Sequence, residues 1–217
     1  MKTIPASPGD PPAAHRDLPL AALISGRRSV RRFRPDPVAH ADLYALLEAA
    51  RWAPSPHGRQ PWRFVVLTRP ELRRQLADAM GAEWHRQLAL DGQDAAEVER
   101  RLQISRIRIT SAPAIIIPCL YLADLDVYPD AERNAAEQTM AIQSLGCAIQ
   151  NMLLSAYQRG LDTGWMCAPL FCPEVVVAAL ALDTALIPHA LIPVGYAAVD
   201  PVRRPRRPLD ELIARFD

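Results

Sequence analysis

This sequence has almost no lysine and almost no net charge. Only Lys2 among its 25 basic residues is a lysine, so the other 24 are arginines. The 24 acidic residues balance the basic ones and leave a net charge of +1. A nearly neutral protein has no overall field that attracts nucleic acid or an anionic membrane. Any anion must therefore be bound by a local group of arginines, whose guanidinium groups suit phosphate oxygens.

The sequence also lacks the signatures of several large protein classes. Its four cysteines form no CxxC pair, and no histidine stands at zinc-ligand spacing, so we expect reduced thiols and no metal site. Neither a GxGxxG nor a GxxxxGKS loop is present, which excludes the common nucleotide-binding signatures. No run of about 18 apolar residues and no signal peptide occurs, so we expect a cytoplasmic protein without a membrane span.

Half of the 217 residues are apolar, and a chain of this length commonly forms one domain. Residues 1–16 are rich in proline, so we expect a flexible leader there and a single domain over residues 17–217. Apolar residues at helical spacing predict helices within residues 17–26, 39–53, 70–90, 94–109, 130–159, 173–180 and 209–216. Apolar runs predict strands within residues 62–67, 115–122, 161–167 and 190–196. This order indicates the α+β class, with helices around a central mixed or antiparallel sheet.

Three local features refine these elements. Asp17 stands where it could cap the first helix. Pro118 predicts an edge or bulge position in its strand, because proline has no N–H to donate to a neighbouring strand. Residues 130–159 carry apolar side chains around more than one narrow face, so we expect a long central helix at a homodimer interface.

The densest basic cluster follows the expected stop of the first helix at Gly26. Five arginines lie among residues 27–34, together with the hydroxyl of Ser29. Converging guanidinium groups and a hydroxyl after a helix stop could bind one compact dianion. On these residues alone, a nucleic-acid patch and an ordinary solvated face remain open as alternatives. A second arginine group stands near the C-terminus and consists of Arg203, Arg204, Arg206 and Arg207.

Four segments, in this order, resemble the nitroreductase family of FMN-dependent enzymes. They are the arginine cluster with the proline-rich loop 54–61, the run from Gln60 to Phe64, the segment 160–166 after the long helix, and the closing segment 195–211. The resemblance implies a nitroreductase-like fold and an intertwined homodimer with FMN at the subunit interface. It also implies NAD(P)H as the reductant.

The resemblance further implies roles for individual residues. The FMN phosphate would be held by Arg27, Arg28, Ser29 and Arg31, with Arg206 and Arg207 closing over it. The flavin would be met, from the partner subunit, by Ser55, Pro56, His57 and Gln60. Near flavin N5 it places Met166, Cys167 and Ala168, with the backbone N–H of Cys167 or Ala168 as the donor. No catalytic side chain is expected, because N5 itself accepts and returns the hydride.

One branch of the family is a still better match to the sequence. Segments 53–57, 128–140 and 171–176 are similar to the C-terminal, FMN-binding domain of the γ-glutamyl ligase that matures a deazaflavin coenzyme. We therefore expect an FMN-dependent oxidoreductase that passes a hydride from NAD(P)H or another reduced carrier to an electron-poor acceptor in a ping-pong cycle. A reductase or binder of a deazaflavin coenzyme or its dehydro precursor is one alternative. A non-catalytic flavin or nucleic-acid binding module is another.

The choice of small-molecule substrate depends on residues 80–108. Their cationic and aromatic groups would suit a large anionic aromatic molecule if they lay over the flavin. The same arginines could instead pair with the glutamates and aspartates of their own helices on a solvated surface. The groups concerned are Trp84, His85, Arg86, Arg100, Arg101, Arg106 and Arg108.

Overall fold

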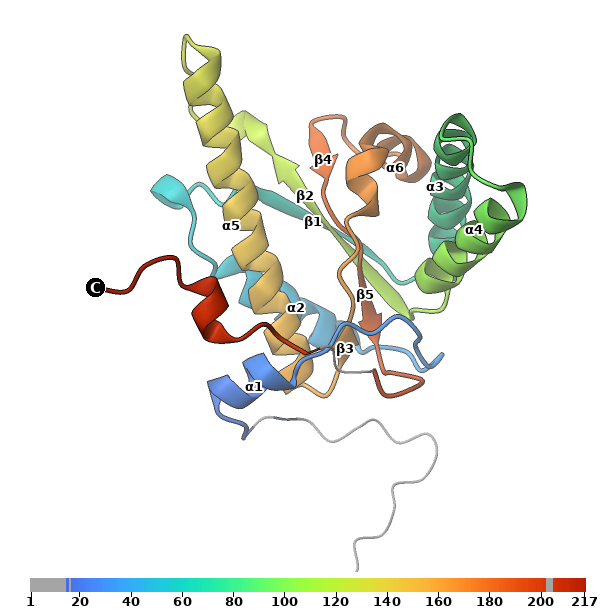
Figure 1. The fold of residues 1–217 in the computed structure, drawn as a ribbon, viewed down its shortest axis with the longest axis horizontal. Helices are drawn as coiled ribbons and strands as arrows, with labels where there is room; N and C mark the ends of the chain where they lie inside the picture. The colour runs from blue at the N-terminus through green and yellow to red at the C-terminus, as the bar shows by residue number, and fades with distance from the viewer. Residues whose placement is uncertain (1–14, 16, 202–204) are drawn as a thin grey trace, which may run out of the picture.

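A central antiparallel sheet carries helices on both of its faces (Figure 1). The computed structural model describes residue 15 and residues 17–201 and 205–217. The proline-rich leader expected at residues 1–16 thus lies outside the described residues except for His15, whose ring is 4.5 Å from that of Tyr157. Arg203 and Arg204 also lie outside them.

Within the described residues the sheet has five strands in the order β1-β2-β5-β3, with β4 pairing β2 further along. Their bounds are β1 Trp62–Leu67, β2 Ala114–Tyr121, β3 Asp162–Thr163, β4 Leu186–Pro188 and β5 Ile192–Gly195. Trp62 lies opposite Leu120 in the β1–β2 register, and Ala114 lies opposite Val194 in the β2–β5 register. All of these pairings are antiparallel.

The helices divide into two groups around the sheet (Figure 1). One group contains α1 Leu20–Gly26, α2 His40–Arg51 and the long α5 Ala131–Gln158. The other contains α3 Pro70–Leu90, α4 Ala95–Thr110 and α6 Pro173–Leu180. Short 3-10 turns lie at Pro56–Gly58, Leu122–Asp124, Ala168–Phe171 and Leu209–Leu212.

Strand β2 joins the two halves of the core because its alternate side chains point to opposite faces. Ile116 and Leu120 pack in the cluster with α2 and α5, whereas Ile115 and Ile117 pack with α3 and α6. Burial on both faces explains why this strand is an unbroken apolar run in the sequence. The expected α+β class and helix-covered sheet are confirmed.

Helix α5 begins after Asp130, whose carboxylate accepts a hydrogen bond from the Arg133 N–H at 2.9 Å. Its C-terminal half is buried through Leu145, Ile149 and Met152. Its N-terminal end extends beyond the sheet in Figure 1, and Ile142 is 47% exposed. The expected long helix is confirmed, and part of its apolar surface is left uncovered by this chain.

Several local expectations were wrong. Asp17 does not cap α1, because the helix begins only after Pro19. Pro118 lies in the central strand β2 and not at an edge, with Phe64 of β1 opposite it. On its other side it lies in the gap between the pairings with β5 and with β4, so its missing N–H costs no hydrogen bond between strands. The strand expected over residues 161–167 shortens to β3, and β4 was not expected. The C-terminal helix is a single 3-10 turn.

No helix in the part of the chain that the structure describes is both long and apolar enough to cross a lipid bilayer.

Candidate functional site

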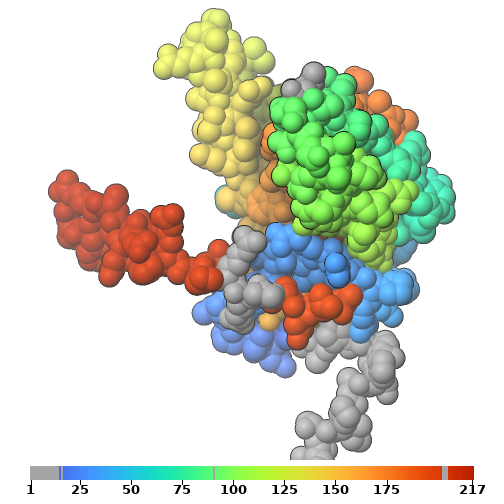
Figure 2. Space-filling view, turned by 45° about the vertical axis from the view of Figure 1, so that its right-hand side comes forward, coloured from blue at the N-terminus to red at the C-terminus, as the bar shows by residue number. Residues whose placement is uncertain are grey.

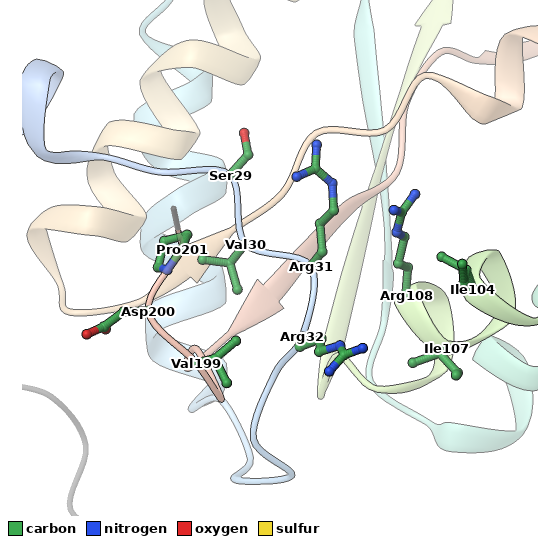
Figure 3. Close-up of a pocket in the computed structure, with 10 residues that line it drawn as sticks. All are labelled: Ser29, Val30, Arg31, Arg32, Ile104, Ile107, Arg108, Val199, Asp200 and Pro201. Atoms are coloured by element: carbon green, nitrogen blue, oxygen red, sulfur yellow. The ribbon is translucent and has the colours of Figure 1, made fainter. Parts of the chain in front are cut away.

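The arginine segment after α1 runs as an extended chain beside β3. Val30 N–H donates to the Thr163 carbonyl at 2.9 Å, and Ser29 forms a parallel bridge with Thr163. Successive side chains of an extended chain point to opposite sides. Val30 therefore enters the core at 2% exposure, while Ser29 and Arg31 point together toward the other side (Figure 3).

Gly164 allows this close approach of two backbones. A Cβ atom at this position would lie 2.7 Å from the Val30 carbonyl oxygen and 3.1 Å from the Pro193 ring. Real Cβ atoms do not come so close to backbone oxygen, so any larger residue would push the arginine segment away from β3. The absence of a side chain at Gly164 therefore lets the arginine segment pack against β3.

Two half-buried arginines in this segment carry unbalanced charge. Burial, and the positive charge of Arg206, lower the pKa of Arg27. Arg28 donates from Nη1 to the carbonyls of Ser25 at 2.7 Å and Arg27 at 2.6 Å. Its Nη2 is buried and finds no partner among the described residues. A buried guanidinium donor without an acceptor is costly, and an anion bound here would satisfy it.

A cavity of about 600 Å³ opens beside this segment (Figure 3). Its walls come from Ser29 to Arg32, from α4 and from residues 199–201. Arg108 of α4 lies next to Arg31, and burial and the Arg31 charge together lower its pKa. The cavity therefore combines a hydroxyl, several cations and apolar side chains, which is a composition suited to a phosphorylated aromatic molecule.

The other arginines of α3 and α4 do not belong to this cavity. Arg86 pairs with Glu83, and Arg106 pairs with Asp78 at 2.8 Å. Arg100 and Arg101 both pair with Glu97 at 2.7 Å. For these four arginines the structure favours the alternative of ion pairs on a solvated surface, because Glu83 and Glu97 lie three or four positions away and Asp78 of α3 lies next to Arg106.

The proline-rich loop is constrained but distant from the cavity. His57, Gly58 and Gln60 have φ angles of 53°, 65° and 50°, and left-handed geometry at two non-glycine residues is uncommon. Ser55 Oγ accepts a hydrogen bond from the Gln60 N–H at 3.0 Å, and Pro56 starts the turn. In Figure 1 the loop and β3 lie on opposite sides of α5. This chain alone does not bring the loop to the arginines.

The segment expected near flavin N5 begins next to β5. Met166 exchanges hydrogen bonds with Leu191, because its N–H donates at 3.0 Å and its carbonyl accepts at 2.8 Å. Its amide is thus already engaged, and Pro169 has none. Cys167 and Ala168 are exposed, and their N–H groups have no acceptor within the described part of the chain. These two amides are the ones available to a ligand.

The C-terminal arm projects from the body of the molecule (Figures 1 and 2). Arg206 and Arg207 are exposed at its start, and Arg206 lies near enough to lower the pKa of Arg27. Three apolar side chains further along are largely exposed, namely Leu209 at 70%, Leu212 at 64% and Phe216 at 89%.

Sequence reasoning named Arg108 but did not single out Ile104, Ile107 or residues 199–201 of the cavity wall. Ile104, Ile107 and Arg108 have i, i+3 and i+4 spacing, which places them on one helical face. That spacing was a usable signal for the wall. Which residues this face meets depends on the packing of α4 against the rest of the chain. Among the residues described, no group of three metal-ligating side chains is arranged to hold a metal ion.

The chain is similar to proteins of one family over most of its length. An "NADH dehydrogenase" of Thermus thermophilus is 30% identical, covering 91% of this chain and 95% of the relative. A candidate nitroreductase of Desulfovibrio desulfuricans, solved in complex with FMN, is 28% identical with a TM-score of 0.69, covering 93% of this chain and 98% of that one.

The fold is also shared with the FMN-dependent nitroreductase NfnB of Mycobacterium smegmatis, solved with NADPH. The two are 23% identical with a TM-score of 0.70, and the match covers 91% of this chain and 97% of NfnB. Residues 24–196 match the nitroreductase family as a whole. The expected family is thereby confirmed, and this chain belongs to the nitroreductase family.

Proposed function

We propose that this nitroreductase-family protein is an FMN-dependent oxidoreductase driven by NAD(P)H. The observation that carries the proposal is the group of half-buried arginines around Ser29, where Arg28 keeps a buried donor without an acceptor. A phosphate dianion matches this group in charge and in number of acceptor oxygens. Its proposed ligands are Arg27, Arg28, Ser29 and Arg31, with Arg206 and Arg207 from the arm.

The chain's own groups would bind and orient the cofactor. FMN, when bound, supplies the hydride chemistry between NAD(P)H and an electron-poor acceptor in a ping-pong cycle. The arginines would hold its phosphate end, and the rest would extend from the Ser29-to-Arg31 segment into the cavity. The free amide of Cys167 or Ala168 would donate a hydrogen bond to the flavin, and Met166, whose own amide is engaged with Leu191, would contact it through its side chain.

We also propose that the working unit is a homodimer. The loop with Ser55, Pro56, His57 and Gln60 is held in a strained form far from the cavity of its own chain. A second copy could bring the same loop to the flavin. The apolar side chains of the C-terminal arm and Ile142 of α5 are exposed in one chain and would be covered in a dimer.

The experiment begins with purified protein. We expect flavin absorbance in the preparation, stoichiometric uptake of FMN by the apoprotein, and NAD(P)H oxidation coupled to reduction of a nitroarene. Sedimentation should give a dimer, and a structure of that dimer should bury more than about 2,000 Å², as obligate interfaces do. Failure of the apoprotein to bind FMN would refute the proposed cofactor. A stable monomer carrying FMN would refute the shared site.

A deazaflavin coenzyme or its dehydro precursor is the second candidate substrate. It is favoured by the sequence similarity of segments 53–57, 128–140 and 171–176 to the deazaflavin ligase domain. Four of the arginines expected to attract such an anionic aromatic molecule are engaged in ion pairs, which leaves Arg108 in the cavity. Titration of the FMN-loaded protein with the deazaflavin, at low and raised salt, separates this candidate from a general nitroreductase.

A further inference from the structure

Arg108 differs from the surface arginines of α3 and α4 in its surroundings. It is partly buried in the cavity wall, and no acidic partner pairs with it within the described residues. Arg106, two positions earlier, turns to the other side of the helix and pairs with Asp78 at 2.8 Å. Within one turn of α4, Arg106 is thus paired at the surface, whereas Arg108 is unpaired in the cavity wall.

Arg108 and Arg31 form a two-cation edge of the cavity. Figure 3 shows their side chains running in the same direction from α4 and from the extended segment. Partial burial and then the charge of the neighbouring Arg31 lower the pKa of Arg108. Arg108 is half-buried and Arg31 is exposed, so an anion bound between them would offset the repulsion of the two like charges.

The wall beneath this edge is apolar. Ile104 and Ile107 of α4 lie on the same helical face as Arg108, and Val199 approaches from the C-terminal segment. The carboxylate that also borders the cavity, Asp200, points away from the two arginines in Figure 3. A ligand here would therefore meet an apolar surface for its body and two cations for one end.

We propose that Arg108 forms, with Arg31, an anion subsite that selects aromatic electron acceptors carrying a carboxylate. This rests on the proposed FMN-dependent function and defines its substrate class. Arg31 is shared with the cofactor, so Arg108 is the residue that distinguishes an anionic acceptor from a neutral one. The anionic groups of NAD(P)H are the other source of a negative charge that could use the same edge.

The test compares 4-nitrobenzoate with the neutral, nearly isosteric 4-nitrobenzamide. Calorimetry measures the binding of each to the oxidised protein as isolated, and steady-state kinetics measures their KM values and the KM for NADPH. In Arg108→Gln we expect 4-nitrobenzoate to bind at least about tenfold more weakly, while 4-nitrobenzamide changes less than about twofold. Arg108→Lys should restore part of the loss. Arg106→Gln is the matched control and should leave both unchanged.

Several outcomes would overturn the subsite. Equal weakening of both compounds would mean that Arg108 only shapes the wall, and no change in either would mean that it contacts no substrate. Loss of FMN affinity in Arg108→Gln would assign the residue to the cofactor, and a selective rise in the NADPH KM would assign it to the donor. If the wild type takes up no FMN, the proposed function fails; 4-nitrobenzoate binding that depends on Arg108 would then still support the subsite.

Discussion

Two regions of this molecule are rich in arginine but differ in whether those arginines have acidic partners. Four surface arginines of α3 and α4 follow a glutamate by three or four residues, so that each pair closes across one helical turn, namely Arg74, Arg86, Arg100 and Arg101. In the extended segment after α1, Arg34 pairs with Asp36, but Arg27 and Arg28 are half-buried and have no acidic partner among the residues described. Backbone conformation decides which arginines are neutralised within the chain.

The difference has an energetic meaning. Exposed pairs contribute little to stability, because water already solvates both charges. A half-buried guanidinium that lacks an acceptor raises the free energy of the folded protein until a ligand provides one. The helical arginines are therefore already neutralised, and the extended segment is the one that we propose binds an anion.

The largest effect should come from separating the extended segment from β3. Gly164→Ala would place a Cβ 2.7 Å from the Val30 carbonyl, and we expect it to cost about 1–3 kcal/mol of unfolding free energy and to abolish tight FMN binding. Urea unfolding and flavin titration measure the two losses. Gly81→Ala in α3 is the matched control: its Cβ would meet nothing within 4 Å, so stability should be kept or raised. Equal losses in both variants would contradict this account of Gly164.

An intermediate effect should follow from removing one arginine from each region. Arg27→Ala should weaken FMN binding by about 1.5–3 kcal/mol, or roughly 10- to 150-fold, because a charge-assisted contact to phosphate is lost. Arg86→Ala removes an exposed arginine paired with Glu83 and should leave FMN affinity and the thermal midpoint unchanged. Fluorescence titration of the two apoproteins measures both. An unchanged affinity in Arg27→Ala would remove this residue from the phosphate site.

The smallest effects concern Asp162 of β3, which lies beside the extended segment, and Glu83 of α3, and they should have opposite signs. Burial raises the pKa of Asp162 above its ordinary 3.8, so its ionisation costs stability as the pH rises from near 3.8 through the raised value. Asp162→Asn should therefore gain stability relative to wild type across that window. Hydrogen bonds from Arg86 and Gln87 lower the pKa of Glu83 from 4.5 to about 2, so its contribution is present above 4.5 and is lost as the pH falls toward 2.

Glu83→Gln should consequently lose stability relative to wild type as the pH rises from about 2 to 4.5. Urea unfolding of both variants at closely spaced pH values gives the two slopes. Slopes of the same sign would show that the two carboxylates do not differ in the way their surroundings indicate.

Most of the fold could be predicted from hydrophobic periodicity. Helices α2, α3, α5 and α6 and strand β1 lie within one or two residues of their expected bounds, because a long periodic stretch constrains an amphipathic element strongly. Short elements were harder to predict. Strand β3 has two residues and β4 has three, and such lengths are defined by their partners and not by any pattern of their own.

The sequence alone determined the arginine cluster after the first helix, because a helix stop, a serine and arginines at fixed positions are local features. Its resemblance to the nitroreductase family implied the cofactor and the residues proposed to hold FMN. Only the tertiary structure decided that Gly164 admits the Val30 backbone, that Arg108 is the unpaired arginine of α4, and that the loop around His57 stands apart from the cavity. The physical reason is that charge pairing and close backbone contact depend on which segments meet in space, and residue spacing along the chain specifies only the nearest of those neighbours.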